Sequence, residues 1–225
     1  SSLAEKPWAE LFTDQYLQNL VREGLDKNFD LKIAVQKVHE AEAYLDQSKA
    51  ALLPSLSAAA RGTYGRNSES ISPNGPRETD TYQVGLEAGW EADIWGKLRS
   101  SKRAAYASLL YSDAGRKAVQ TRLIADIANT YYTLLALDAQ LAITRETVNK
   151  YVELVETMKT MKESGKVTGA AVMQSEASRY AAEVTIPDLI QRIRETQNTL
   201  CLLLGRNGGE TIERGTIEQQ PPTPA

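Results

Sequence analysis

The sequence predicts a mainly α-helical fold in which long, antiparallel, coiled-coil-like helices are joined to a two-stranded β-hairpin. Three observations lead to this prediction. Residues 97–163 contain no proline and carry an apolar repeat of seven residues, residues 55–93 alternate between two faces, and a glycine-bounded turn at 164–169 precedes a second helical stretch. A helical period, a strand period and a tight turn in one chain indicate helices that double back on one another next to a hairpin.

The chain begins with two shorter helical segments. Residues 14–27 form one apolar stripe at helical spacing, and Asp30 is a suitable N-cap for a second helix that ends near Leu52, before Pro54. Serine, threonine, asparagine and aspartate cap helix N-termini, and proline cannot continue a helix. We therefore expect an N-terminal segment with a short helix at 1–29, followed by a helix within 30–54.

The long helix is predicted over residues 97–163, where Gly115 is the only glycine. Apolar residues recur there at seven-residue steps: Ile127, Leu134, Leu141, Val148 and Val155. Such a repeat is typical of coiled-coil packing, and at about 1.5 Å per residue the helix would be on the order of 100 Å long. A returning helix follows over 170–204, with a kink or restart at Pro187 and a cap at Gly205. The long-helix domain thus covers 30–54 and 94–205, and 206–225 is expected to be a linker.

The segment 55–93 has the period of a β-hairpin. In 81–93 the apolar row is Tyr82, Val84, Leu86, Ala88, Trp90 and Ala92, and the opposite row is Gln83, Gly85, Glu87, Gly89, Glu91 and Asp93. Residues 56–65 alternate more weakly, and a polar loop with Pro73 and Gly75 connects the two stretches. The period alone fits two situations equally well: one face packed on a soluble core, or one face in lipid and the other in water.

Composition excludes several classes of function. The 26 basic and 29 acidic residues are mixed, no basic face stands out, and nucleic acid is not an expected partner. One cysteine and one histidine allow neither an internal disulfide nor a Cys/His metal cluster, and Cys201 sits in an apolar run that predicts burial. Glu87, Glu91 and Asp93 form an acidic row without supporting residues for catalysis. We expect no enzyme activity, no cofactor and no metal.

Several motifs resemble those of a known family. They are the N-terminal segment with Trp8 and Phe12, the stretch 89–99 in which a Trp-Glu pair precedes an Asp, an aromatic residue, a Gly and a basic residue, and the run Leu202-Leu203-Leu204-Gly205-Arg206. Their order along the chain resembles that of the TolC-like outer-membrane factor family, which forms the exit ducts of tripartite efflux pumps. Members usually contain two structural repeats, and this chain resembles the first repeat only, so we expect it to be a fragment.

The resemblance implies a fold and a function. It implies a segment of an α-barrel continuous with two strands of a transmembrane β-barrel, in a bacterial outer-membrane lipoprotein whose helices lie in the periplasm. The function it implies is a passive export duct for drugs or other small molecules, homotrimeric when full length, with a periplasmic adaptor protein, an inner-membrane pump and outer-membrane lipid as partners. The alternative is a periplasmic adaptor or a coiled-coil scaffold protein without a channel.

The resemblance also assigns roles to residues. Lipid-facing strand positions would be Tyr64, Tyr82, Val84, Leu86 and Trp90. Lumen-facing positions would be Arg61, Gln83, Glu87 and Glu91. The strand–helix junction would be Asp93, Trp95, Gly96 and Arg99, and the adaptor-contact tip would be Gly165, Lys166, Val167, Thr168 and Gly169.

Overall fold

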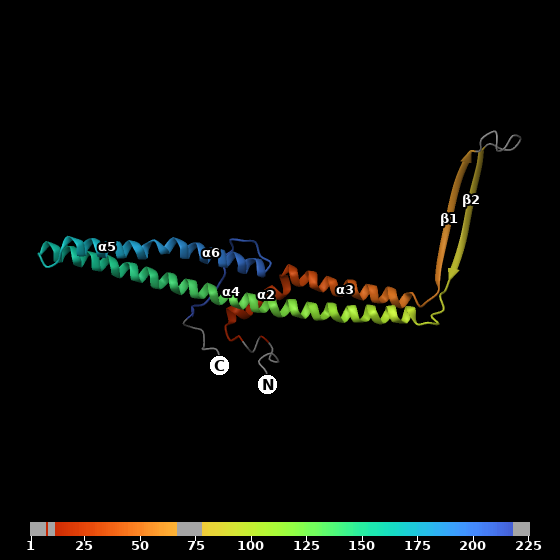
Figure 1. The fold of residues 1–225 in the computed structure, drawn as a ribbon, viewed down its shortest axis with the longest axis horizontal. Coiled ribbons are helices and arrows are strands. Elements are labelled where there is room, and N and C mark those ends of the chain that lie inside the picture. Colours follow the sequence, from red (N-terminus) through yellow and green to blue (C-terminus); the bar gives the residue numbers. More distant parts are fainter. Residues whose placement is uncertain (1–7, 9–11, 67–77, 218–225) are drawn as a thin grey trace. The chain divides into compact units, whose positions relative to one another are not determined.

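The computed structural model describes residues 8, 12–66 and 78–217 (Figure 1). The elements follow in the order α2 (Gln15–Lys27), α3 (Phe29–Ala50), β1 (Ser55–Arg66), β2 (Glu78–Gly89), α4 (Lys97–Glu163), α5 (Gly169–Glu183) and α6 (Thr185–Leu203). Long helices and one antiparallel hairpin confirm the predicted fold class. Residues 1–7, 9–11, 67–77 and 218–225, on which parts of the prediction fall, lie outside the described residues.

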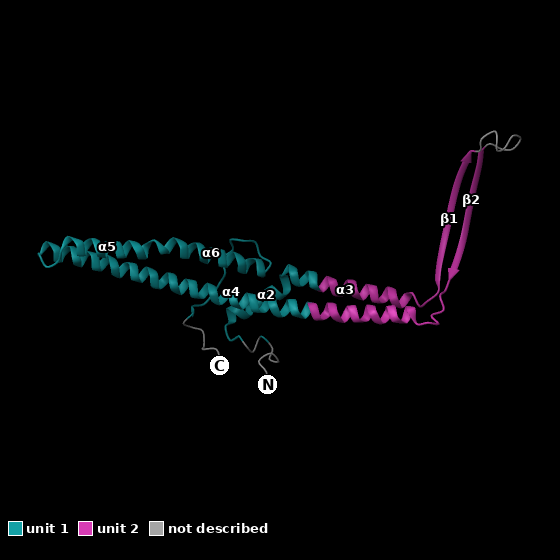
Figure 2. Ribbon diagram, in the orientation of Figure 1, with its two compact units in different colours: residues 1–34, 116–225 teal, residues 35–115 magenta. Residues whose placement is uncertain are grey.

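The chain divides into two compact units (Figure 2). The first unit contains residues 1–34 and 116–225, and the second contains residues 35–115. The helices α3 and α4 each contribute to both units, whereas the hairpin belongs entirely to the second. None of the described helices is long and apolar enough to cross a membrane.

In the first unit α5 and α6 run back alongside the C-terminal part of α4 (Figure 2). The heptad row is the reason for this packing. Ile127, Leu134 and Val155 are at most 1% exposed, and Leu141 and Val148 are half-buried. From the returning side, Leu189, Ile193 and Leu200 complete the same apolar core. Burial of this stripe stabilises helices that could not hold their conformation through propensity alone.

Asp14 fixes the start of α2 and also ties it to α4. One carboxylate oxygen accepts the backbone N–H of Tyr16 at 2.7 Å, and the other accepts the Tyr131 hydroxyl at 2.6 Å. Tyr131 is fully buried. Burial, and then the hydrogen bond to Asp14, raise the pKa of this phenol above its usual range. Tyr131 therefore stays a neutral donor that joins the two helices.

The break between α2 and α3 is capped by Asn28, and the prediction of Asp30 as the N-cap is wrong. The Asn28 side chain accepts the N–H of Leu31 at 2.9 Å and donates to the carbonyl of Leu203 at 2.9 Å. Asn28 is 5% exposed. An amide can accept and donate at once, whereas a carboxylate can only accept, so asparagine satisfies both α3 and the end of α6. Asp30 instead lies in the first turn of α3.

The returning segment is two helices, as the restart expected at Pro187 requires. α5 ends at Glu183, and α6 begins at Thr185 after the single residue Val184. Pro187 is thereby placed in the first turn of α6, where its missing N–H has no partner to lose. A continuous helix would bring the proline ring against the carbonyl of Glu183.

Gly205 ends α6 where the chain passes very close to α2. Its φ is +68°, and the N–H groups of Gly205 and Arg206 return to the carbonyls of Leu202 and Cys201 at 3.1 and 2.8 Å. This is a Schellman cap. A Cβ at position 205 would lie 2.7 Å from the carbonyl oxygen of Lys27. Backbone conformation and space both demand glycine here.

The segment after α6 is anchored to the first unit. Ile212 is 2% exposed within the core, and the Arg214 guanidinium pairs with the Asp138 carboxylate on α4, with Nη2 to Oδ1 at 3.1 Å. Arg206 pairs with Glu23 on α2, with Nε to Oε1 at 2.9 Å. The described part of the expected linker, 206–217, is thus held to α2 and α4 by charge pairs and apolar burial.

Candidate functional site

The register of the hairpin separates an apolar face from a polar one. Leu56, Ala58 and Ala60 pair with Ala88, Leu86 and Val84, whereas Ser57 and Arg61 pair with Glu87 and Gln83. Side chains opposite one another in a ladder lie on the same face. The apolar residues of β1, where the alternation is weak, therefore lie on the same face as the apolar residues of β2, where it is strong.

Both faces of the hairpin are exposed. Tyr64, Tyr82, Val84 and Leu86 are between 64% and 87% exposed on the apolar face. If the hairpin packed on a soluble core, that core would cover its apolar face. Within the part of the chain that the structure describes, no core covers this face. Each strand has 12 residues. A strand of about 9–11 residues, tilted by about 45°, spans a bilayer.

Two residues assigned to the strand lie outside it. β2 ends at Gly89, so Trp90 and Glu91, predicted as lipid-facing and lumen-facing strand residues, belong to the connection that leads to α4. The ladder ends at Ser55 opposite Gly89, because Pro54 has no N–H with which to extend it. The Trp90 indole N–H donates to the carbonyl of Leu52 at 3.2 Å. This hydrogen bond therefore links the segment before β1 to the segment after β2.

The strand–helix junction is organised by Asp93. Its carboxylate accepts the backbone N–H groups of Leu98 and Arg99 at 3.1 and 3.0 Å and the Arg99 guanidinium Nε at 3.2 Å. Gly96 occupies the N-cap position, since its carbonyl accepts the Ser100 N–H at 2.9 Å. Partial burial opposes ionisation of Asp93, but the bonds from Arg99 and Leu98 outweigh it and lower the pKa of this carboxyl. The predicted motif residues Asp93, Gly96 and Arg99 thus start the long helix.

Trp95, the fourth predicted junction residue, and its neighbour Ile94 face solvent. Trp95 is 90% exposed and Ile94 is 72% exposed. Lys97 pairs with Glu91 at 3.2 Å. Large apolar side chains beside charged ones are typical of a membrane–water interface or of a protein contact.

The turn at 164–169 closes α4 and opens α5. Gly165 has φ +72°, and the N–H groups of Gly165 and Lys166 donate to the carbonyls of Lys162 and Met161, both at 2.9 Å. This is a second Schellman cap. Lys166 is exposed and Val167 is half-buried. The five predicted tip residues are contiguous at this helical turn, and the hairpin lies in the other unit.

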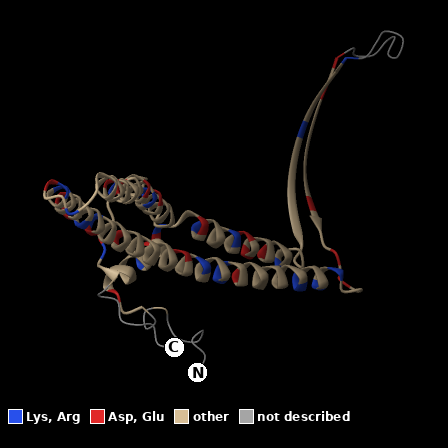
Figure 3. Ribbon diagram, turned by 60° about the vertical axis from the view of Figure 1, so that its left-hand side comes forward, with Lys and Arg blue, Asp and Glu red and all other residues tan. Residues whose placement is uncertain are grey.

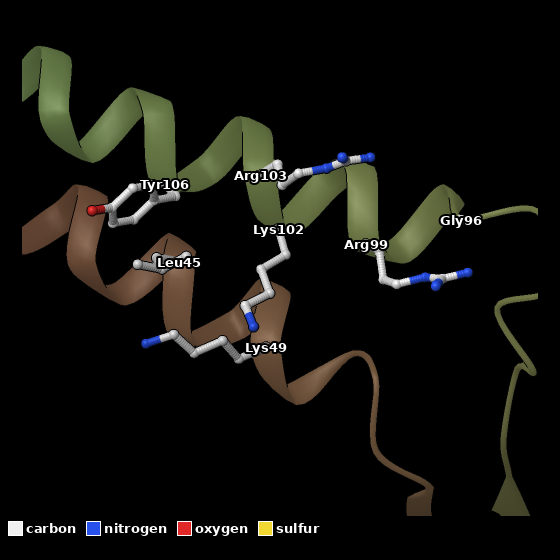
Figure 4. Close-up of a pocket in the computed structure, with 7 residues that line it drawn as sticks. All are labelled: Leu45, Lys49, Gly96, Arg99, Lys102, Arg103 and Tyr106. Atoms are coloured by element: carbon white, nitrogen blue, oxygen red, sulfur yellow. The ribbon is translucent and has the colours of Figure 1, made fainter.

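The sequence interpretation missed a basic pocket in the second unit, between the end of α3 and the start of α4 (Figure 4). We call it the basic pocket; it has a volume of about 710 Å³ and is lined by Leu45, Lys49, Gly96, Arg99, Lys102, Arg103 and Tyr106. Residues 97–103 contain four cations, and the next acidic residue is Asp113. Figure 3 shows these blue positions at the start of α4. The expectation that no basic face stands out is therefore wrong for residues 97–103. The mixed charge of the whole chain does not reveal a basic run of only seven residues.

The charges of the basic pocket are only partly neutralised. Lys49 pairs with Asp46 at 2.8 Å and Arg99 pairs with Asp93 at 3.2 Å. Among the described residues Lys102 forms no ion pair, and Arg103 only donates to the Ser100 hydroxyl at 3.2 Å. Two free cations therefore remain at this pocket.

Comparisons with known proteins agree with this architecture. The family model described as outer membrane efflux protein matches residues 20–206. The solvent efflux pump outer membrane protein SrpC of Pseudomonas putida is 32% identical over 197 residues, which cover 87% of this chain and 42% of SrpC. The probable outer membrane lipoprotein SilC of Salmonella typhimurium is 30% identical over 219 residues, 96% of this chain and 46% of SilC.

A solved structure shows the same fold. The open state of the MtrE outer membrane channel of Neisseria gonorrhoeae superposes with a TM-score of 0.79 at 25% identity, over 95% of this chain and 47% of MtrE. The chain thus spans about half the length of the relatives that it matches.

The chain belongs to the outer membrane efflux protein family. Its localisation is accordingly the bacterial outer membrane, with helices that extend into the periplasm. The alternative of a periplasmic adaptor or a coiled-coil scaffold is not supported, because the family match extends over most of the helices and the hairpin.

Proposed function

We propose that this chain is one half of a protomer of an outer-membrane efflux channel, a passive duct through which drugs or other small molecules leave the cell. The observation that carries the proposal is the register of the hairpin, which places both apolar rows on one exposed face and both polar rows on the other. Strands in lipid need an apolar outer face, a polar inner face and a closed ladder of backbone hydrogen bonds. An isolated pair of strands leaves two edges open, so the duct requires strands from further segments.

The lipid-facing and lumen-facing roles follow from this register. Tyr64, Tyr82, Val84 and Leu86 would contact lipid, and Arg61, Gln83 and Glu87 would contact water in the duct. Trp90 and Glu91 would lie at the periplasmic rim of the barrel, because they follow the last ladder pair. The names of relatives such as SrpC describe solvent efflux pumps, which supports small molecules as the exported class.

Channel formation is testable by conductance of the complete gene product in planar bilayers. We expect discrete current steps from the wild type. The double variant Val84→Glu/Leu86→Glu should give none, because charges on a lipid face near the midplane are destabilising, by about 2–4 kcal/mol for each Lys or Arg and by less for each Glu. The matched variant Thr81→Glu/Gln83→Glu carries the same two charges on the polar face and should still conduct. Loss of conductance in both variants, or in neither, would contradict the assignment.

The turn at Gly165, Lys166, Val167, Thr168 and Gly169 is proposed as the contact for a periplasmic adaptor, which would link the duct to an inner-membrane pump. Its support is the exposed Lys166 and the exposed backbone next to two helix ends. A photoreactive label attached to the cysteine of Val167→Cys should cross-link to an adaptor. The contact would be refuted if this position captured no adaptor while a labelled cysteine in the middle of a helix did.

We also propose that the complete protein is a homotrimer. Its mass in detergent tests this, and we expect three times the mass of one protomer.

A further inference from the structure

The basic pocket combines charge with apolar surface in a way that a solvated helix face does not. Lys49, Arg99, Lys102 and Arg103 surround it, and Leu45 and Tyr106 supply its apolar part. In Figure 4 Lys102 extends from α4 towards α3, and Tyr106 lies beside Leu45. A volume of about 710 Å³ is in the range of small-molecule sites.

Four cations lie at the start of α4, and only two of them have carboxylate partners. Lys97 and Arg99 are in the first turn, where the positive end of the helix dipole disfavours them, and they pair with Glu91 and Asp93. Lys102 and Arg103 are in the second turn and have no carboxylate partner in the described chain. An anion bound beside these two residues would supply the missing negative charge.

The neighbourhood of the pocket specifies the kind of anion. The chain that enters α4 carries Trp90, Ile94 and Trp95, which are 66%, 72% and 90% exposed. Tryptophan is enriched where membrane meets water, and lysine and arginine at that level attract anionic lipid headgroups. The apolar part of the pocket, Leu45 and Tyr106, suits the glycerol and the first acyl carbons of a lipid.

We propose that the basic pocket binds the phosphate of an anionic phospholipid of the inner leaflet of the outer membrane. The phosphate would accept hydrogen bonds from Lys102 and Arg103, the two cations that have no carboxylate partner in the described chain. This inference rests on the proposed function, since it requires the hairpin to enter the membrane just before α4. The lipid would hold the start of the long helix at the membrane surface.

The test measures which lipids stay bound to the complete gene product. The protein is reconstituted in nanodiscs of phosphatidylethanolamine and phosphatidylglycerol at a ratio of 3:1, released, and analysed by native mass spectrometry. We expect retained phosphatidylglycerol in excess of its share of the bilayer. Removal of two cations in Lys102→Gln/Arg103→Gln should lower this retention by about tenfold or more at low salt.

A matched control removes two exposed cations elsewhere on α4. Arg145→Gln/Lys150→Gln has the same change in net charge and should retain lipid like the wild type. Equal loss in both variants, or no loss in Lys102→Gln/Arg103→Gln, would overturn the proposal. Inorganic phosphate at the same ionic strength should not displace the lipid; displacement at equal concentration would assign the pocket to free phosphate and also overturn it.

Conductance in planar bilayers separates this inference from the proposed function. A Lys102→Gln/Arg103→Gln protein that still conducts but has lost its bound phosphatidylglycerol supports the lipid site. If all of these proteins conduct and retain lipid equally, the lipid site alone is refuted. If none conducts, the channel is refuted, and with it the reason to expect a lipid at this position.

Discussion

At the scale of single residues, two glycines at helix ends look alike in sequence and differ in structure. Gly165 and Gly205 both have positive φ and both form Schellman caps. A Cβ on Gly165 would meet nothing within 4 Å, whereas a Cβ on Gly205 would meet the backbone of Lys27. The first glycine is required by conformation only, and the second by conformation and by close approach of α2.

Alanine substitution should separate these two requirements. We expect Gly165→Ala to lower the free energy of unfolding by roughly 1–2 kcal/mol, the cost of a left-handed residue with a Cβ. Gly205→Ala should cost about 3 kcal/mol or more, because the backbone of Lys27 must also move. Urea unfolding followed by circular dichroism measures both values. Equal losses would mean that the approach of α2 to the end of α6 is not as close as described.

The sequence identified the residues of the junction motif but not their bonds. Asp93, Gly96 and Arg99 stand out because the stretch 89–99 resembles the strand-to-helix junction of the TolC-like family. That Asp93 caps the amides of Leu98 and Arg99 across a turn requires the backbone path, which no local propensity specifies. Burial of Cys201, in contrast, is confirmed and followed directly from its apolar neighbours.

At the scale of elements, long-range ion pairs hold the segment after α6 in place. Glu23 on α2 binds Arg206, and this hydrogen bond, with a further contribution from Lys27, lowers the pKa of Glu23 from 4.5 to about 2 although burial opposes it. The two partners are 183 residues apart in sequence. Sequence patterns carry no information on such a pair, because each charge alone resembles an ordinary surface residue.

The Glu23 pair predicts a loss of stability in acid. A carboxyl whose pKa is lower in the folded state stabilises the fold above its unfolded value of about 4.5 and loses this contribution as the pH falls towards 2. Thermal unfolding of Glu23→Gln should be less dependent on pH between these limits than that of the wild type, by about 1–2 kcal/mol once solvent screening is included. Glu40→Gln, an exposed carboxyl on α3, should keep the wild-type dependence. Identical pH profiles for wild type and Glu23→Gln would contradict the pair.

The helices were predicted more accurately than the strand ends. The limits of α4 agree with the prediction because a proline-free heptad stretch and a glycine turn define them locally. The end of β2 was placed too late, since alternation continues past Gly89 although the partner strand stops at Pro54. The period of one strand predicts its faces, but its length depends on the other strand. The basic pocket could not be predicted either, because Lys49 reaches it from a different helix.

At the scale of the whole molecule, the chain spans about half the length of the proteins to which it is related. The hairpin has no neighbour strand within the described chain and exposes both edges and both faces. Open edges are not tolerated in a bilayer, where every backbone group must be paired. The proposed duct therefore requires several such hairpins, and this chain supplies one of them.

The central claim is that β2 separates lipid from water. It is tested most directly by spin labels placed, one at a time, at each position from 82 to 87. The labelled protein is the complete gene product in bilayers, with Cys201 replaced by alanine. The account predicts that access of oxygen, which concentrates in lipid, peaks at Tyr82, Val84 and Leu86, and that access of a water-soluble nickel complex peaks at Gln83, Gly85 and Glu87. Access profiles that rise and fall together, or that show no period of two, would contradict it.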